Sequence, residues 1–452
     1  MWSDRTPPER LRALVKKLHS ALPPPGTGDA ARIEQVEEFS QVAPGFASVT
    51  GTRPLLLHNP LATITYSNGS AVIAGPAGAV EISAPAFDVL AAMLEAWRGP
   101  AEAIFAGFLS YDLATEIEDV GVTPPPDFTF PQFYFALYDS YLRLEGDRWV
   151  QVTTNAWRTP PASPRRRLPE RPIHGGPLHS CPSQSAFETS VERIVATIRA
   201  GDIFQTNLCR RLEAGLDPAM AWDLFQRMRT ISPAQYESYF QIDDQRAILS
   251  ISPELFLRVE AGMVESSPIK GTRPRATDAT EDQALSSDLL ASEKDRAELA
   301  MIVDVVRNDL GRVCETGSVE VTQHAALMTL PTVHHLYSTV RGRLRDGLVD
   351  LLRAAFPAAS ITGAPKIEAI RAALREEGQL RGPCMGAIGW ISLDGNMELS
   401  VAIRTAFTSD GHVRYYVGCG ITADSDPHSE LIESRHKAAA FVRALDRREI
   451  TR

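Results

Sequence analysis

Two acidic residues stand one helical turn apart near the carboxyl end of the chain. The segment from Tyr415 to Glu433 predicts a strand, a glycine turn and then a helix, for which Asp426 suits the N-cap and Pro427 the first helical position. Glu430 and Glu433 then share one face close to the positive end of this helix. Such a pair can hold a magnesium ion, although an acidic first turn that only complements the helix dipole is the commoner arrangement.

The glycine turn before this helix offers a second chemical function. Gly418 and Gly420 flank Cys419, and glycines leave their backbone N–H groups free of side-chain obstruction. N–H groups exposed in this way suit an anionic group such as a carboxylate or a phosphate. Taken alone, this turn is a weak signal for a binding site.

A further carboxylate lies earlier in the chain, within a segment that predicts a helix. Glu298 stands among Ala297, Leu299, Ala300 and Met301, so we expect it to be less solvated than the charged residues before it. Burying an unpaired carboxylate is costly, and a hard cation would relieve that cost. An ion pair with an arginine of the same helix explains the pattern equally well.

These residues need strands and helices to bring them together. Up to residue 158 the chain alternates short apolar runs with turn residues, which predicts a first domain built mainly of strands, as at residues 71–74, 103–113 and 133–144. Residues 159–184 are rich in proline and arginine and predict a linker on the surface. Residues 185–452 form the second predicted domain.

The second domain mixes predicted strands with long helices. Ser185 and Glu188 match a capping box before a helix over residues 186–200. Further helices are expected around residues 282–308, 365–376 and 427–447, and strands over residues 247–251, 255–259, 386–392 and 413–417. The sequence has no glycine-rich strand-to-helix turn of the kind found in open parallel sheets, so we expect an α+β sandwich.

Composition narrows the classes of function. The 452 residues carry a formal net charge of -10, which gives no basic field to attract nucleic acid or an anionic membrane surface. The apolar stretches are far shorter than the roughly 18–20 residues of a spanning helix, and no signal peptide is recognised. The five cysteines are scattered along the chain, which argues against a disulfide framework. We therefore expect a cytoplasmic protein that binds neither nucleic acid nor membranes.

Several short strings occur in the order found in one enzyme family. The strings are Gly201-Asp-Ile-Phe-Gln-Thr-Asn-Leu208, Ser252-Pro-Glu-Leu255, Pro268-Ile-Lys-Gly-Thr-Arg-Pro274, Met301-Ile-Val-Asp-Val-Val-Arg-Asn-Asp-Leu310, Thr362-Gly-Ala-Pro-Lys366, Ala402-Ile-Arg-Thr405 and Gly418-Cys-Gly-Ile421. In these strings the chain resembles the chorismate-utilising enzymes, which include anthranilate synthase component I, aminodeoxychorismate synthase component I, and the isochorismate and salicylate synthases.

The amino-terminal region resembles the family's smaller N-terminal domain. The matching strings there are Gly107-Phe-Leu-Ser-Tyr-Asp112 and Leu137-Tyr-Asp139, so the resemblance covers nearly the whole chain. It implies an α+β fold in which a large β-sandwich with outer helices packs against this smaller domain. The active site is then expected between the sheets.

The resemblance also implies a magnesium ion held by Glu298 and Glu433, with Glu430 nearby. The ion would hold the ring carboxylate of chorismate, and carboxylate and water ligands suit magnesium. A guanidinium suits a two-point clamp on the enolpyruvyl carboxylate, which is the implied role of Arg404. The implied substrate-binding residues are Gln205, Thr272, Thr362, Gly363, Arg404, Gly418, Gly420 and Lys437.

Three residues match the family's catalytic positions. Glu254 matches the general acid that protonates the departing 4-hydroxyl group, a task that needs a carboxyl group kept neutral by its surroundings. His335 matches the histidine of the pocket. Lys270 is the third residue of the Pro-Ile-x-Gly-Thr motif, where aminodeoxychorismate synthases tend to carry lysine and anthranilate synthases carry alanine.

The lysine suggests covalent catalysis. Its amine would attack C2 of chorismate while the hydroxyl leaves with a proton from Glu254, and ammonia would then attack C4 and expel the lysine. A lysine that only pairs with a substrate carboxylate or with Glu430 is the alternative. The implied reaction is the conversion of chorismate to 4-amino-4-deoxychorismate, for para-aminobenzoate and folate biosynthesis.

Gln205 points to the nucleophile. It stands where the isochorismate and salicylate synthases carry a lysine base that activates water, so ammonia is the expected nucleophile here. Ammonium dominates at neutral pH, and the sequence contains no glutamine-amidotransferase domain. A separate glutamine amidotransferase subunit is therefore the implied partner.

Two other functions stay open. Anthranilate synthase component I would share these residues apart from Lys270, and it would release pyruvate. A non-catalytic regulatory subunit would have lost a metal-binding or acid residue. The chain keeps Glu254, Glu298, Arg404, Glu430 and Glu433.

Overall fold

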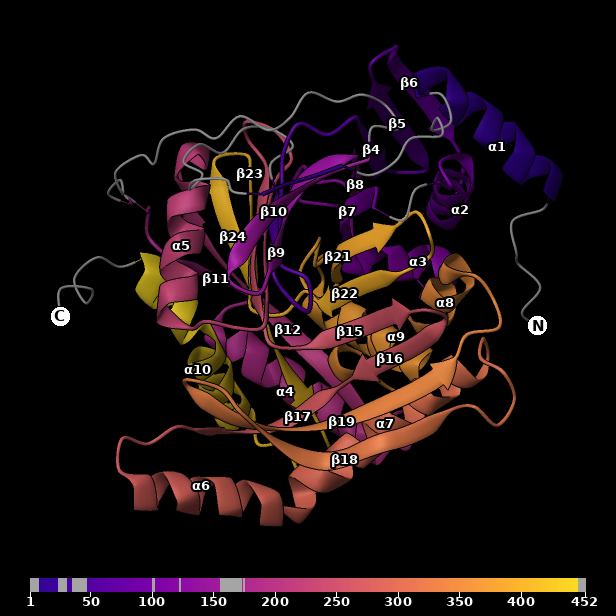
Figure 1. Ribbon diagram of the computed structural model, residues 1–452. Coiled ribbons are helices and arrows are strands. Elements are labelled where there is room, and N and C mark those ends of the chain that lie inside the picture. The colour runs from indigo at the N-terminus through magenta and orange to yellow at the C-terminus, as the bar shows by residue number, and fades with distance from the viewer. Residues whose placement is uncertain are drawn as a thin grey trace.

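The chain folds around two antiparallel sheets of twelve strands each (Figure 1). In this computed structural model the described residues are 8–22, 31–34, 47–99, 102–121, 123–154, 173 and 175–445. Helices and large antiparallel sheets together confirm the predicted α+β class.

The first sheet carries several of the predicted site residues at one end. In spatial order its strands are β1 (Ala31–Glu34), β10 (Arg148–Thr153), β9 (Ser140–Glu145), β3 (Leu55–Leu57), β2 (Ala47–Val49), β13 (Tyr236–Gln241), β14 (Ala247–Ser252), β23 (Thr405–Ser409), β24 (His412–Ile421), β12 (Gln205–Gly215) and β11 (His179–Cys181). The short strand β20 (Gly363–Ala364) pairs with β12.

The second sheet carries the remaining strand residues of the predicted site. In spatial order its strands are β17 (Ile269–Pro274), β19 (Val333–Arg343), β16 (Met263–Ser267), β15 (Leu255–Glu260), β22 (Met397–Val401), β21 (Ala387–Ser392), β7 (Ile104–Leu109), β8 (Phe133–Tyr138), β4 (Ala62–Ser67), β5 (Ser70–Gly75) and β6 (Gly78–Ser83). Strand β18 (Glu320–Thr329) pairs with β19.

Helices pack against both sheets. α4 (Gln184–Arg199), α5 (Ala221–Ile231) and α10 (Pro427–Leu445) contact the first sheet, and α9 (Lys366–Glu377) contacts β12. α6 (Ala279–Ala291) and α7 (Glu293–Gly311) contact β17 and β19, and α8 (Leu348–Ala355) contacts α7. α1 (Pro8–Ala21) and α2 (Ala86–Ala96) lie together beside β5, and α3 (Ala114–Ile117) follows the 3-10 turn Tyr111–Leu113.

Strands from both predicted domains lie in the same sheets. β2 pairs with β13 in the first sheet, and β7 pairs with β21 in the second. A Cβ atom on Gly107 of β7 would lie 1.9 Å from the carbonyl oxygen of Tyr134, so glycine allows a close approach between β7 and β8. The division at residues 159–184 stays a prediction, since most of that segment lies outside the described residues.

Aromatic rings connect the two sheets through the core. The ring of Phe108 in β7 lies 5.7 Å from that of Phe130, which lies 4.8 Å from Phe407 in β23. Phe407 in turn stacks on Tyr416 of β24 at 6.4 Å. On the other face of the first sheet, Tyr415 stacks on Phe441 of α10 at 4.5 Å. The first sheet is therefore packed on both faces.

Several sequence predictions about individual elements were wrong in detail. The run over residues 133–144 is two strands, because the chain passes from the second sheet to the first at Asp139, between β8 and β9. Helix α4 is capped by the hydroxyl of Ser183, which accepts the N–H of Ala186 at 3.3 Å, so no box forms at Ser185. The helix expected over residues 282–308 is divided at Ser292, whose hydroxyl caps α7.

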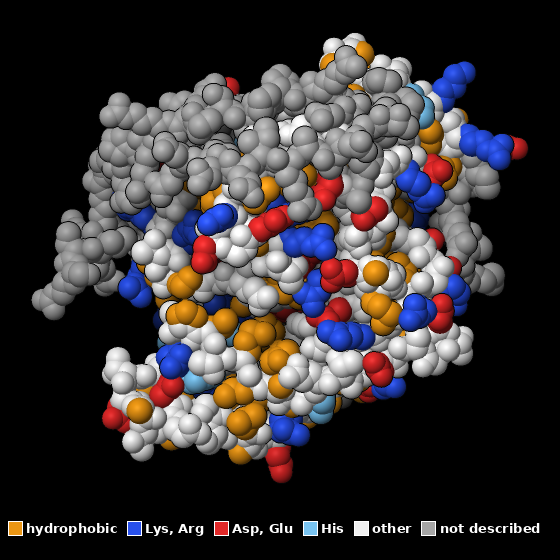
Figure 2. All heavy atoms as spheres, viewed as in Figure 1, with side chains coloured by type: hydrophobic (Ala, Val, Ile, Leu, Met, Phe, Trp, Pro, Cys, Tyr) orange, Lys and Arg blue, Asp and Glu red, His pale blue; other side chains and the backbone are white. Residues whose placement is uncertain are grey.

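Charges of both signs share the surface. Lys and Arg side chains alternate with Asp and Glu side chains over the described part of the face in Figure 2. Among the helices that the structure describes, none combines the length and the apolar character needed to cross a membrane.

Candidate active site

The predicted site residues meet where the two sheets approach each other. Gln205 of β12 and Gly420 of β24 come from the first sheet, whereas Lys270 of β17 and His335 of β19 come from the second. Helices α7 and α10 add the acidic residues, beginning with Glu298 on α7. Positions more than two hundred residues apart in the sequence thus lie around one centre.

Lys270 lies at this centre. Its Nζ donates a hydrogen bond to the carbonyl oxygen of Ser360 at 3.0 Å. A Cβ atom on Gly420 would lie 3.5 Å from that Nζ and 2.5 Å from Nε2 of Gln205, so glycine leaves room for both side chains. Burial lowers the pKa of Lys270, although the charge of Glu298 acts in the opposite direction. The lowered pKa favours the neutral amine that a nucleophile requires.

Gln205 presents a buried amide to the same space. The residue is 1% exposed, and neither Oε1 nor Nε2 has a hydrogen-bond partner among the described residues. Buried polar atoms in folded proteins are nearly always hydrogen-bonded. A buried amide without partners indicates a place where a polar ligand could bind.

Helix α10 begins as its sequence predicts. Oδ1 of Asp426 accepts the N–H of Ser429 at 2.8 Å, so Asp426 is the capping residue. Pro427 is the first residue of the helix. The cap fixes the first turn, and with it the position of Glu430.

Glu430 and Glu433 lie side by side at the start of α10. A carboxylate oxygen of each and Sγ of Cys419 all lie within 4.8 Å of one another. The Glu433 carboxylate pairs with the Lys437 ammonium at 2.7 Å, and that ammonium also donates to the carbonyl oxygen of Gly418 at 3.0 Å. Gly418 and Gly420 lie within strand β24, paired with β12, so the glycine turn that the sequence predicted is wrong. The acidic pair lies directly beside this end of the strand.

The three side chains of this group differ in pKa. Burial raises the pKa of Glu430, and burial also raises the pKa of the Cys419 thiol to about 12. Burial acts the same way on Glu433, but the charge of Lys437 and its hydrogen bond hold the pKa of Glu433 below its ordinary value. Glu433 is thus ionised at neutral pH, while the thiol stays protonated.

Glu298 reaches the site from α7. It lies outside the group of atoms formed by Cys419, Glu430 and Glu433, yet its charge interacts with both Lys270 and Glu433. Burial raises the pKa of Glu298. The three predicted metal-binding carboxylates therefore border one region, with two of them in close contact.

Arg404 and His335 form a pair across the two sheets. Nη2 of Arg404 lies 3.4 Å from Nε2 of His335, and a guanidinium can only donate, so Nε2 is the acceptor. Nδ1 of the histidine carries the proton, 3.3 Å from the carbonyl oxygen of Gly271 and 2.9 Å from Oγ1 of Thr272. Burial and the charge of Arg404 lower the pKa of His335 to about 4, which keeps the imidazole neutral.

The backbone of Arg404 has a left-handed conformation, with φ of 50°. This conformation is uncommon for a residue other than glycine, and it often marks a functional constraint. It aims the guanidinium from the start of β23 towards the second sheet.

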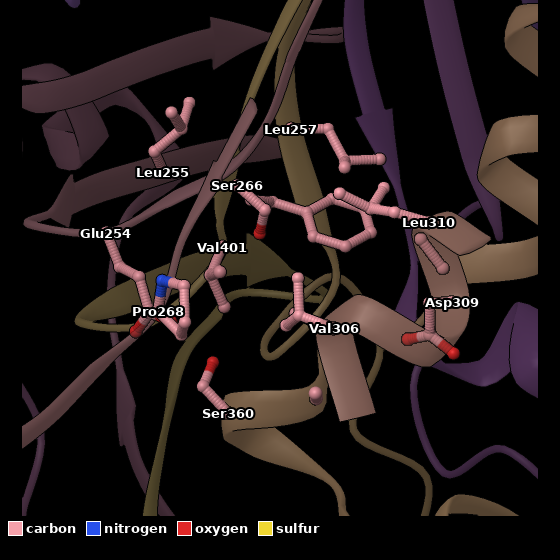
Figure 3. Close-up of a pocket in the computed structure, with 14 residues that line it drawn as sticks. Glu254, Leu255, Leu257, Ser266, Pro268, Val306, Asp309, Leu310, Ser360 and Val401 are labelled. Atoms are coloured by element: carbon pink, nitrogen blue, oxygen red, sulfur yellow. The ribbon is translucent and has the colours of Figure 1, made fainter. Parts of the chain in front are cut away.

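Glu254 lies in the turn between β14 and β15, and its charge interacts with that of Lys270. It is 3% exposed, and burial raises the pKa of its carboxyl group to about 7, against the lowering effects of the Ser360 hydroxyl and the Lys270 charge. Its side chain lines a small cavity together with Pro268, Ser360 and Asp309 (Figure 3). A carboxyl group with this pKa can hold and release a proton near neutral pH.

Thr362 and Gly363 form part of the framework of this region. Oγ1 of Thr362 donates towards the carbonyl oxygens of Ala358 and Ala359 at 3.1 and 3.2 Å, so the hydroxyl braces its own turn. A Cβ atom on Gly363 would lie 2.1 Å from the carbonyl oxygen of Gln205, which explains why glycine is needed where β20 meets β12. Contact of either residue with substrate stays a prediction.

The structure adds groups that the sequence analysis did not single out. Ser360 contacts Lys270 through its carbonyl group. Lys366 forms a buried ion pair with Asp309, with Nζ 2.7 Å from Oδ2. Asp309 and Lys366 end or nearly end two of the matched strings, which is the only signal that the sequence carried for them.

Comparisons with known proteins agree with this arrangement. The family model for chorismate binding enzymes matches residues 45–443. Aminodeoxychorismate synthase component 1 of Bacillus subtilis is 34% identical over 362 residues, which cover 75% of this chain and 76% of that protein. Anthranilate synthase component 1 of Streptomyces coelicolor is 42% identical over 269 residues, which cover 59% of this chain but 52% of that protein.

Solved structures share the fold. Anthranilate synthase component I from Streptococcus pneumoniae TIGR4 superposes with a TM-score of 0.74 and 29% identity, covering 90% of this chain and 95% of that one. MenF, the menaquinone-specific isochorismate synthase from Escherichia coli, superposes with a TM-score of 0.73 at 19% identity, covering 97% of this chain and 100% of that one, which bears on the fold alone. The family model matches residues 45–443, and the Bacillus subtilis relative is 34% identical over three quarters of its length. The chain therefore belongs to the family of chorismate binding enzymes.

Proposed function

We propose that this chain is the synthase component of an aminodeoxychorismate synthase, which converts chorismate and ammonia to 4-amino-4-deoxychorismate, the precursor of para-aminobenzoate. The observation that carries the proposal is Lys270. Its amine lies in the site beside Gln205 and Gly420, and burial lowers its pKa. An amine in that state can act as a nucleophile.

The acidic residues fit a hard divalent cation. Carboxylate oxygens of Glu430 and Glu433 lie close together, and the neighbouring Cys419 stays protonated and is a poor ligand. Glu298 and Glu433 would hold a magnesium ion, with Glu430 nearby. When bound, the ion would offset the negative charge of the ring carboxylate of chorismate.

Chorismate binding uses the other charged and backbone groups of the site. The Arg404 guanidinium would donate two parallel hydrogen bonds to the enolpyruvyl carboxylate. His335 is neutral and is held by Thr272. It therefore contacts the guanidinium without cancelling its positive charge. The N–H groups of Gly418 and Gly420, near the end of β24, would bind a substrate carboxylate.

Lys270 and Glu254 would then carry the substitution. The lysine nitrogen forms a bond to C2 as the C4–O bond breaks, and Glu254 transfers its proton to the departing oxygen, which leaves as water. Ammonia forms a bond to C4 as the bond from C2 to the lysine breaks. The proton that the new ammonium group sheds returns to the Glu254 carboxylate, so chorismate and ammonia give the aminated product and water.

Gln205 supports ammonia over water as the nucleophile. An amide is not a base at neutral pH, so this position cannot activate water. Its Nε2 and Oε1 are buried and unpartnered among the described residues, available to a neutral polar molecule. Since the relatives are named as component 1, we propose a separate glutamine amidotransferase subunit as the source of ammonia.

Anthranilate synthase component I is the second candidate. The relative of that name in Streptomyces coelicolor is 42% identical over 269 residues, a higher identity than that of the aminodeoxychorismate synthases. Both reactions begin from chorismate and ammonia. They differ in that anthranilate formation also releases pyruvate.

A single experiment separates the two. The purified chain is mixed with chorismate, magnesium and ammonium at mildly alkaline pH, and products are resolved by mass spectrometry. We expect aminodeoxychorismate that keeps its enolpyruvyl group, at least about 100-fold less of it with Lys270→Ala, and no change with the exposed control Lys16→Ala. Anthranilate together with pyruvate would instead make the chain an anthranilate synthase.

A further inference from the structure

One residue outside the predicted set contacts both groups that would carry out the substitution. Ser360 lies in the 3-10 turn Ala359–Ile361. Its carbonyl oxygen accepts the hydrogen bond from Lys270 Nζ at 3.0 Å. Its side chain lines the cavity that Glu254 also lines, and Figure 3 shows the hydroxyl pointing into that cavity.

The Ser360 hydroxyl is buried beside the Glu254 carboxyl group. The residue is 8% exposed, and Oγ is close enough to lower the pKa of Glu254, although it makes no well-aligned hydrogen bond to the described residues. A buried hydroxyl in that state costs stability, which an alanine at the same position would avoid. Stability alone therefore does not explain why a serine stands at this position. An interaction of its hydroxyl with the Glu254 carboxyl group does explain it.

The turn that carries Ser360 is braced on both sides. The hydroxyl of Thr362 donates towards the carbonyl oxygen of Ala359, and Nη1 of Arg381 lies 3.4 Å from the carbonyl oxygen of Ile361. The N–H of Asn207 in β12 donates to the carbonyl oxygen of Thr362 at 2.8 Å. Ser360 thus lies between residues whose positions are fixed by hydrogen bonds.

A buried ion pair fixes the longer segment around the turn. Nζ of Lys366 lies 2.7 Å from Oδ2 of Asp309 and 2.7 Å from the carbonyl oxygen of Ala355. Lys366 therefore joins the two ends of residues 355–366 to each other and to α7. Because α7 also carries Glu298, the metal-binding side of the site and the Ser360 turn share one support.

From these contacts we infer that Ser360 is a positioning residue that holds the Lys270 amine and the Glu254 carboxyl group at a fixed separation. The carbonyl group fixes the amine, and the hydroxyl faces the acid. The inference rests on the proposed function, in which bond formation at C2 and proton transfer to the leaving oxygen take place together. Both groups must then be placed relative to each other, and one rigid turn does this for both.

The first test removes the hydroxyl and keeps the carbonyl group. In Ser360→Ala we expect kcat for amination to fall about 3- to 10-fold, the size of effect that loss of one polar contact to Glu254 has, with the KM for chorismate unchanged. The hydroxyl lowers the pKa of Glu254, as the charge of Lys270 on β17 also does, so its loss moves the basic limb of the pH profile to higher pH. Ser360→Thr restores a hydroxyl and should restore both kcat and the profile.

A matched control uses another buried serine. Ser238 of β13 is 1% exposed, and its hydroxyl likewise makes no well-aligned hydrogen bond to the described residues. Ser238→Ala should leave kcat and the pH profile unchanged. A Ser360→Ala protein with wild-type kcat and pH profile would overturn the inference, and so would a change in KM alone.

The second test follows the amine without turnover. Asp309→Leu combined with Lys366→Met replaces the buried ion pair by apolar side chains, an exchange that folded proteins often tolerate. The acylation rate of Lys270 by acetic anhydride, read by peptide mass spectrometry across pH, should rise at least about 3-fold as the amine loses its fixed acceptor. An unchanged rate in a folded double variant would overturn the carbonyl part of the inference. If the wild-type chain makes anthranilate, the proposed function fails, while this labelling still reports on the contact between Ser360 and Lys270.

Discussion

The carboxylate of Glu433 and the ammonium of Lys437 lie 2.7 Å apart, one turn from each other on α10. In the proposed site a magnesium ion on Glu433 would compete with this ammonium for the same carboxylate. The ion pair would then link metal binding to the position of Lys437, which also donates to the carbonyl oxygen of Gly418.

Removal of the ammonium should strengthen metal binding. In Lys437→Met we expect the Kd for magnesium, measured by calorimetry at pH 8, to fall about 10-fold, because a competing positive charge is lost. The KM for chorismate should rise in the same variant, since a group predicted to bind substrate is gone. The exposed Lys16→Met serves as control, and weaker magnesium binding by Lys437→Met would contradict the competition.

Loss of a carboxylate that is proposed to bind magnesium should raise the magnesium requirement. Glu298→Gln keeps the size of the side chain but removes its charge, so we expect the magnesium concentration for half-maximal activity to rise at least about 10-fold. Glu293, at the exposed start of the same helix, gives the control Glu293→Gln, which should behave as wild type. Equal magnesium dependence in the two variants would remove Glu298 from the metal site.

The pH dependence of turnover should follow Glu254. Burial raises its pKa to about 7, and in the proposed reaction the protonated form would be the acid for the leaving hydroxyl group. As pH rises through about 7 this form is lost, so kcat should fall about 10-fold per pH unit above that value. Total ammonium must be adjusted to hold free ammonia constant across the series.

The variant that tests this assignment is Glu254→Gln. It cannot donate the proton, and we expect a loss of about 100-fold or more in kcat, with no basic limb in its profile. His335, whose pKa is lowered to about 4, stays neutral throughout this range and adds no limb of its own. A basic limb that persists in Glu254→Gln would assign the limb to another group.

Gly420 should not tolerate even one added methyl group. A Cβ atom there would lie 2.5 Å from Nε2 of Gln205 and 3.5 Å from Nζ of Lys270, so one of these side chains must move. Gly420→Ala should lower kcat/KM on the order of 100-fold, since small displacements of reacting groups have effects of this size. Gly311, which has open space around it, provides the control Gly311→Ala, and comparable losses in both would point to a general effect on folding.

Much of the site could be predicted because its candidate residues lie in short sequence motifs. Asp426 and Pro427 mark the start of α10 by type alone, and this places Glu430 and Glu433 together. The contact between Lys270 and Ser360 could not be predicted, since it joins residues 90 positions apart through a carbonyl group that any residue type carries. The sequence also could not predict that strands of both predicted domains lie in the same sheets, because short apolar runs do not specify which strand pairs with which.

A buried ion pair behind the site should control the stability of the fold. The side chains of Arg381 and Glu377 are 1% and 0% exposed and lie 2.7 Å apart, and Arg381 also donates to the carbonyl oxygen of Asn207 at 2.7 Å. Removing one partner leaves the other charge buried and unpaired, so Arg381→Met should lower the free energy of unfolding by about 3–5 kcal/mol. Glu377→Leu combined with Arg381→Met should recover part of this loss, because no unpaired charge is left.

The neighbouring surface pair between α4 and α9 gives the matched comparison. Arg193 is 65% exposed and lies 3.3 Å from Glu376, so Arg193→Met should change the free energy of unfolding by at most about 1 kcal/mol. Urea midpoints read by circular dichroism measure both variants under identical conditions. If Arg381→Met and Arg193→Met unfold at the same urea concentration, the buried pair is not a determinant of stability.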